Sequence, residues 1–246
     1  MTDNANGFRR VHVARAFEDI AGQIRDELTQ GRLRAGDRLP PERELAGQFG
    51  VSRNTLREAL RSLEISGLIT LKKGASGGAF VKDSSGEVVV SGIRDMFALG
   101  AVTLGQITES RIWIESAIVR AACERHTDQD VARLRENMIL AADAVKRKDF
   151  FARAEKHLEF HLILAKATGN PIMDVIMESL IGVMRQFILT IGPHNIVDYA
   201  LSSRQRFMTH FEARDAESAV KEMEDHLKRV NRNYVKVLGA RSKTKA

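Results

Sequence analysis

Residues 39–81 read LPPERELAGQFGVSRNTLREALRSLEISGLITLKKGASGGAFV and contain the start and stop signals of two short helices. Pro41 favours a first helical turn, and Gly50 favours the end of that helix. Ser52 is a good N-cap for a second helix, and Gly67 is a stop signal behind it. Because only a few residues separate the two helices, the segment predicts a helix-turn-helix.

Two short β-prone runs follow, at residues 68–71 and 78–81, on either side of the basic, glycine-rich segment KKGASG. This pattern predicts a β-hairpin with a cationic tip that includes Lys73, which is the wing of a winged helix-turn-helix. Apolar residues at helical spacing between Val13 and Gly31 predict one more helix, which would support the other two.

The free face of the second predicted helix carries arginines at four-residue spacing, opposite its apolar residues. Arginine binds guanine through two parallel hydrogen bonds, asparagine suits adenine, and a threonine methyl contacts thymine. A solvated face is the alternative for such a row of arginines, but the tight turn and the hairpin favour double-stranded DNA as the partner. The residues predicted to contact DNA from this helix are Ser52, Arg53, Asn54, Thr55 and Arg57, with Arg43 of the preceding helix over the DNA backbone.

The same segment resembles the GntR family of bacterial transcription regulators. The resemblance is carried by LPPERELA at 39–46, VSRNTLREAL at 51–60, and GLI at 67–69 followed by a lysine–glycine wing. It implies that Arg43, Arg53, Arg57 and the wing residue Gly74 contact operator DNA. It also implies a homodimer on a short inverted repeat.

Composition agrees with this prediction but would not have produced it. The 246 residues carry a net charge of +6, and the excess is spread evenly, because residues 1–85 hold 14 basic against 11 acidic residues. Cys123 is the single cysteine, which excludes a disulfide framework and predicts a reducing compartment. No signal-like or membrane-spanning apolar run is present, so we expect a cytoplasmic protein with no membrane partner.

After residue 87 helical periodicity dominates. We expect helices near 88–99, 104–125, 128–147, 149–168, 172–191, 197–213 and 215–238. The predicted fold is mainly α, with an N-terminal winged helix-turn-helix of three helices and a β-hairpin joined to an all-α, antiparallel C-terminal bundle. The expected divisions are a disordered N-terminus (1–12), the DNA-binding domain (13–83), a linker and connecting helix (84–103), the bundle (104–239) and a disordered basic tail (240–246).

Histidines make the predicted bundle more than a scaffold. His157 and His161 are four residues apart and share one helix face, a spacing that can hold a metal ion. If the last two helices form an antiparallel hairpin that turns near residues 214–215, Arg204 faces His226. The sequence therefore predicts a polar cluster inside the bundle.

The bundle resembles the FCD ligand-binding domain of FadR-like GntR regulators. The matching residues are Glu109–Arg111 with Glu115, Phe160–His161 with Thr168–Asn170, Asp215, and His226–Leu227. The resemblance implies a divalent metal held by one Asp and three His, and small carboxylate effectors such as organic or sugar acids. Here His157 stands where the family usually has Asp, and Arg204 stands where it usually has His.

These departures leave three interpretations of the cluster. His157, His161 and His226 can still bind Zn²⁺ or a similar divalent ion. The guanidinium of Arg204 instead repels a dication and suits a carboxylate. We therefore expect a small anionic effector that is bound by Arg111, Asn170 and Arg204. In that case the metal is lost or altered. In the third interpretation the histidines are satisfied interior polar groups.

The functional prediction is a sequence-specific transcription regulator, not an enzyme, that represses transcription as a dimer until an effector binds. An activator of the same architecture is one alternative. A metal-dependent hydrolase that uses His157, His161 and His226 is another, but Glu159 points to another helix face and so is no convincing general base.

Overall fold

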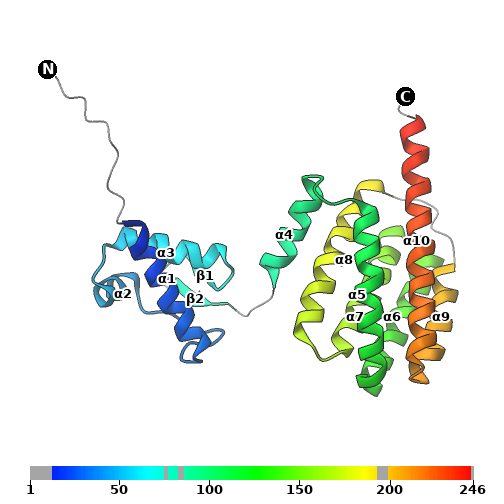
Figure 1. Cartoon of the computed structure of the whole chain (residues 1–246), viewed down its shortest axis with the longest axis horizontal. Coiled ribbons are helices and arrows are strands. Elements are labelled where there is room, and N and C mark those ends of the chain that lie inside the picture. Colours follow the sequence, from blue (N-terminus) through cyan, green and yellow to red (C-terminus); the bar gives the residue numbers. More distant parts are fainter. Residues whose placement is uncertain (1–12, 75–76, 83–85, 193–198, 245–246) are drawn as a thin grey trace. The chain divides into compact units, whose positions relative to one another are not determined.

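The computed structural model describes residues 13–74, 77–82, 86–192 and 199–244 (Figure 1). The predictions for residues 1–12, for the wing-tip residues 75–76, for the linker residues 83–85 and for residues 245–246 lie outside this part. The chain divides into two compact units that meet at residues 88 and 89, inside the predicted linker.

The first unit is a winged helix-turn-helix, as predicted. Its elements are α1 (Val13–Thr29), α2 (Glu42–Phe49), α3 (Arg53–Ile65), β1 (Ile69–Lys72) and β2 (Gly78–Val81). The two strands pair antiparallel, with Ile69 opposite Val81 and Lys72 opposite Gly78.

The apolar stripes of the three helices meet in one core. Ile20 and Ile24 of α1 pack with Leu56, Leu60 and Leu63 of α3, and all five side chains are buried. Full burial of such a side chain stabilises a fold by about 1.5–3 kcal/mol. The core therefore fixes the orientation of α3 and leaves its arginine face exposed.

The turn before α3 has the geometry that its residues predict. Gly50 has a φ of 64°, in the left-handed region, and its N–H bonds back to the carbonyls of Ala46 and Gly47. The Ser52 hydroxyl accepts the backbone N–H of Thr55 at 3.1 Å and so caps α3. These two devices end α2 and begin α3 within three residues.

The second unit is all α-helical in its described residues. After α4 (Glu87–Ala98), which begins in the first unit, it contains α5 (Leu104–Arg125), α6 (Asp128–Lys146), α7 (Phe150–Ala167), α8 (Pro171–Ile191), α9 (Tyr199–Glu212) and α10 (Ala216–Thr244). Thr127 and Asp130 form a capping box at the start of α6, and Asn170 caps α8, which begins at Pro171.

One boundary was wrong. Helix α10 continues to Thr244, whereas we expected it to end near residue 238 and the chain to be disordered from residue 240. Gly239 does not end the helix, because a glycine inside a helix costs only about 1 kcal/mol and the following residues include good helix formers.

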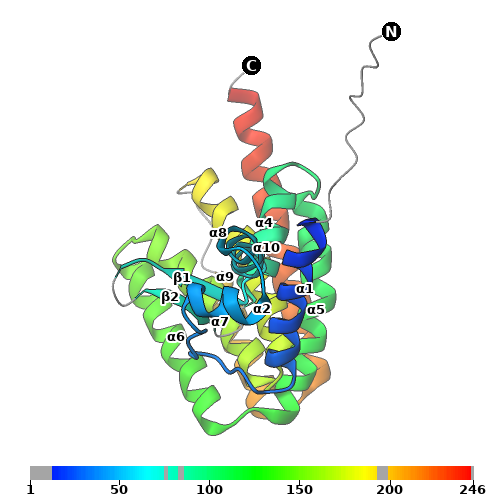
Figure 2. The same cartoon turned by 90° about the vertical axis from the view of Figure 1, so that its left-hand side faces the viewer.

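Helices α5–α10 form a closed ring of pairwise contacts. In the order of packing, α6 contacts α7, α7 contacts α8, α8 contacts α5, α5 contacts α10, α10 contacts α9, and α9 contacts α6. Figure 1 and Figure 2 show these helices side by side in the bundle. Apolar side chains such as Leu134, Phe160, Met184 and Phe211 fill most of the interior. None of the described helices is long and apolar enough to span a membrane.

Candidate functional sites

The predicted DNA-contacting residues lie on one surface region of the first unit. Arg43, Arg53, Asn54 and Arg57 are exposed on α2 and α3. Ser52 and Thr55 have a second role, because their hydroxyl oxygens are 2.9 Å apart and both belong to the cap of α3. The first turn of α3 therefore presents arginine and asparagine side chains from a capped, fixed helix end.

A groove of about 710 Å³ separates α3 from the wing. Arg57, Arg61, Lys72 and Lys73 supply its cations, and Glu42 and Glu64 are its two carboxylates. A phosphate backbone requires an excess of cations of this kind. The groove and the exposed arginines therefore form one face suited to a nucleic-acid duplex.

The two carboxylates in the groove make different contacts: Glu42 pairs with an arginine, and Glu64 bonds to the backbone. The Glu42 carboxylate is 2.8 Å from Nε of Arg57, but both side chains are exposed, and such pairs contribute only about 0–1 kcal/mol. Arg57 can therefore leave Glu42 for a base at little cost. The Glu64 side chain accepts the backbone N–H of Leu71 at 2.9 Å and so ties β1 to α3.

The wing is braced beneath its tip. The ammonium group of Lys72 lies 4.7 Å from the ring centre of Phe80, and Arg38 donates a hydrogen bond to the carbonyl of Gly77. Gly74 has a φ of 102°, which side-chain-bearing residues rarely adopt. Lys73, next to it, is exposed.

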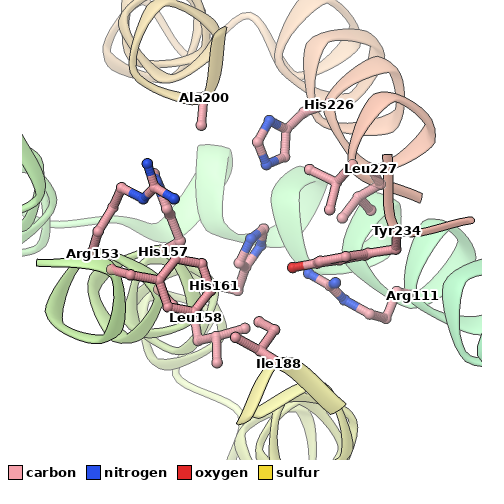
Figure 3. Close-up of a pocket in the computed structure, with 13 residues that line it drawn as sticks. Arg111, Arg153, His157, Leu158, His161, Ile188, Ala200, His226, Leu227 and Tyr234 are labelled. Carbon is pink, nitrogen blue, oxygen red and sulfur yellow. The ribbon is translucent and has the colours of Figure 1, made fainter. Parts of the chain in front are cut away.

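The second unit contains a small interior pocket of about 50 Å³. Its walls come from α5, α7, α8, α9 and α10. Figure 3 shows that polar side chains from three of these helices point toward the same space. The polar residues that line the pocket are Arg111, Arg153, His157, His161, His226 and Tyr234, and the apolar ones are Phe150, Ala154, Leu158, Ile188, Ala200, Leu227 and Val230.

Arg111, Glu115 and His161 form a buried cluster at this pocket. Nε of Arg111 is 2.8 Å from Oε1 of Glu115, and Nδ1 of His161 is 2.6 Å from Oε2 of the same carboxylate. Burial raises the pKa of Glu115, but Arg111 and His161 outweigh burial and hold that pKa below its ordinary value. Glu115 is therefore ionised and balances the charge of Arg111.

The other histidines of the pocket are neutral at pH 7. Burial, and then the charge of Arg204, holds the pKa of His157 well below its ordinary value. Burial, the neighbouring His161 and Arg204 do the same for the pKa of His226. Each neutral imidazole offers one N–H donor and one acceptor nitrogen, so the two rings suit hydrogen bonding.

Arg204 lies close to His226, as the residue numbers of the last two helices predict, but it is not among the described residues that line the pocket. Its guanidinium stacks 4.3 Å from the ring centre of Phe160. One terminal nitrogen donates to the carbonyl of His157 at 2.8 Å, and the other is buried without a hydrogen-bond partner. Burial lowers the pKa of Arg204 to about 9. Its charge acts on the pocket through space, beside the histidines.

The predicted metal ligands have partners that bear on metal binding in opposite directions. Within the described residues, no group of three or more His, Cys, Asp or Glu side chains is placed to hold a metal ion. The nearby charge of Arg204 disfavours a cation beside His157 and His226. The contact of His161 Nδ1 with Glu115 is one that metal-binding histidines commonly make, so a metal held by His157, His161 and His226 stays a prediction.

Asn170 has a structural role at the start of α8, and its predicted effector role stays a prediction. Its side chain caps α8 by accepting the N–H of Ile172 at 3.0 Å, and it does not line the pocket. We expect Asn170→Ala to lower the free energy of unfolding by about 1 kcal/mol, the usual contribution of an N-cap, and Asn170→Ser to restore most of it. Urea unfolding measures the change in stability. Weaker ligand binding by folded Asn170→Ala would support an effector role for Asn170.

Two residues that line the pocket, Arg153 and Tyr234, and one beside it, Glu115, were not predicted as functional candidates. Arg153 lies four residues before His157, Tyr234 lies eight after His226, and Glu115 lies four after Arg111. Each spacing places the residue on the same helix face as one already chosen. Arg153 lines the pocket, and its guanidinium lies 5.5 Å from the ring centre of Phe150.

Two protein-family models match the chain. Residues 16–81 match the bacterial regulatory proteins of the gntR family, and residues 106–229 match the FCD domain. A Bacillus subtilis relative named as an uncharacterized HTH-type transcriptional regulator, YcbG, is 33% identical over 85% of both chains. The HTH-type transcriptional repressor NanR of Citrobacter rodentium is 28% identical over 94% of this chain and 90% of its own length.

Solved structures show the same fold. The GntR protein of Streptococcus agalactiae superposes with a TM-score of 0.69 at 24% identity, covering 88% of this chain and 99% of the other. McbR/YncC of E. coli superposes with a TM-score of 0.50 at 18% identity, covering 90% and 97%.

Proposed function

The chain belongs to the gntR family of bacterial regulatory proteins and carries an FCD domain, and from this premise we propose that it is a repressor released by a small carboxylate. The protein is a DNA-binding transcription regulator of the GntR/FCD type and not an enzyme. The observation that carries the proposal is the pairing of an exposed arginine helix with a separate, polar interior pocket.

For DNA, we propose a homodimer that places α3 of each copy in the major groove. Arg53, Asn54 and Arg57 would contact base edges, and Arg43, Lys73 and Gly74 would lie against the phosphates. Two-fold symmetry then requires an inverted repeat with half-sites about one helical turn apart. Selection of bound sequences from a random library tests this, together with the mass of the complex. A single unrepeated site bound by one copy would contradict the dimer.

For the effector, the pocket favours an anion. Arg111 and Arg153 line it, Arg204 adds a buried positive charge nearby, and Glu115 is the one carboxylate among the described residues of the cluster. A buried charge is costly unless it is paired, so a carboxylate that enters this pocket gains electrostatically. Binding would shift the bundle toward a state with lower operator affinity, in proportion to the effector's preference for that state.

We propose that this effector binds without a metal, since Arg204 supplies a positive charge of its own beside the histidines. Metal analysis of protein purified without a histidine tag tests the idea, with His161→Ala as the comparison. We expect no stoichiometric zinc, nickel, iron or manganese in either protein. One metal ion per chain that disappears in His161→Ala would overturn the metal-free site.

The direction of control also needs a test. The curated NanR relatives are named repressors, which supports repression here. A reporter gene placed behind the selected operator should be silent with the protein and active when the protein is deleted. Loss of expression on deletion would instead make the chain an activator.

A further inference from the structure

We infer that the effector is a short aliphatic acid with few hydroxyl groups, and that the pocket excludes polyhydroxylated sugar acids. This inference rests on the proposed function, because it names the class of carboxylate that the same pocket takes. It is carried by the size of the cavity, the kind of polar groups in its wall, and its apolar side.

The cavity is small. Its volume is about 50 Å³, against about 710 Å³ for the groove between α3 and the wing. A carboxylate with a chain of a few carbons fits this space, whereas a hexose-derived acid is much larger.

The polar wall is rich in donors and poor in acceptors. Among the described residues that line the pocket, the polar side chains are arginine, histidine and tyrosine, and none is Asn, Gln, Asp, Glu, Ser or Thr. Arginine can only donate, so the acceptors are the neutral imidazoles and the Tyr234 oxygen. A carboxylate needs donors and is satisfied here. Each sugar hydroxyl must also donate its proton, and most would find no acceptor, which is costly in a buried site.

The wall has an apolar side that suits a hydrocarbon chain. Figure 3 shows the Tyr234 hydroxyl directed into the pocket, with Leu158 and Ile188 on one side of the space and Leu227 on another. A carboxylate held near Arg111 and Tyr234 would place its chain against Ile188 and Leu158. Each methylene buried there should strengthen binding roughly fourfold, until the cavity is full.

Calorimetric titration of the full-length protein tests the size and chemistry of the ligand. The probes are acetate, propionate, butyrate, pentanoate and hexanoate, with gluconate and glucuronate as the hydroxylated acids. We expect affinity to rise roughly fourfold for each added carbon, to reach a maximum within the series, and to fall at least tenfold beyond it. We expect the two sugar acids to bind at least a hundredfold more weakly than the best aliphatic acid.

A pair of neighbouring residues gives a matched control. Ile188 lines the cavity and is 5% exposed, whereas Leu189 is 59% exposed and faces away. Ile188→Ala should move the maximum to a longer acid by one or more carbons, and Leu189→Ala should leave it in place. Ile188→Val, a smaller change, should shift the maximum in the same direction if Ile188→Ala fails to fold.

The outcomes separate the two levels of the proposal. Tight binding of a sugar acid, with no aliphatic acid bound, would overturn this inference and leave carboxylate control intact. Failure of every acid would overturn the proposed effector class itself. A maximum that stays in place in folded Ile188→Ala and Ile188→Val would show that the acid binds elsewhere, and would also overturn the inference.

Discussion

Glu115→Ala should lower the free energy of unfolding by about 3–5 kcal/mol, the usual cost of removing one partner from a buried ion pair. Glu115 is 2% exposed and its two oxygens contact Arg111 and His161. Removing the carboxylate leaves the Arg111 charge buried without its ion-pair partner. Urea unfolding of the full-length protein, followed by circular dichroism, measures the change.

Glu109→Ala is the matched control, because Glu109 is an exposed acid on the same helix. Its effect should stay within about 0.5 kcal/mol, as for most surface substitutions. Glu115→Gln keeps a hydrogen-bonding side chain of the same shape and should fall between the two. If Glu115→Ala unfolds at the same urea concentration as the wild type, the ionised cluster contributes nothing to stability and the description of the pocket is wrong.

Arg57→Ala should weaken operator binding by roughly 5- to 150-fold, which corresponds to the 1–3 kcal/mol of a bidentate contact to a base. Arg57 is exposed, so its replacement should leave the fold unchanged. The fluorescence anisotropy of labelled operator DNA measures the loss. Binding to unrelated DNA should fall much less, because that binding depends mainly on phosphate contacts.

Arg120→Ala controls for the loss of one positive charge. Arg120 is an exposed arginine of the other unit, paired with Glu217. We expect its operator affinity to match the wild type. Undiminished operator affinity in folded Arg57→Ala would contradict the placement of α3 in the major groove.

The winged helix-turn-helix could be predicted from the sequence because its signals are local. Gly50 and Ser52 act within one turn of their own position, and the structure places both as expected. The arginine face of α3 follows from helical spacing alone. What spacing could not show is that the Ser52 and Thr55 hydroxyls bond to each other, since that depends on rotamers at the cap.

The bundle was predictable as a set of helices but less so in its interior. The hairpin of α9 and α10 brings Arg204 close to His226, as the residue numbers suggested. Spacing gives the face on which a residue lies, but not the direction of a long, flexible side chain. The guanidinium of Arg204 contacts the ring of Phe160 and the carbonyl of His157. Both partners belong to another helix, α7, so the spacing of residues along α9 could not predict these contacts.

Unlike the contacts of Arg204, the positions of Arg153 and Tyr234 could be predicted from helical spacing. Arg153, His157 and His161 recur every four residues, and Tyr234 lies on the same face of α10 as His226. This spacing is visible in the sequence, and it places Arg153 and Tyr234 on the same helix faces as the predicted histidines.

The central claim is that an acid in the bundle controls DNA binding, and operator affinity with and without the acid tests it directly. The anisotropy titration should show weaker operator binding by the wild type at a saturating concentration of the best aliphatic acid. Ala154→Leu adds bulk to the pocket wall. This variant should bind operator with the wild-type affinity, and the acid should not change that affinity. An acid that saturates the wild-type bundle and leaves its operator affinity unchanged would contradict the account.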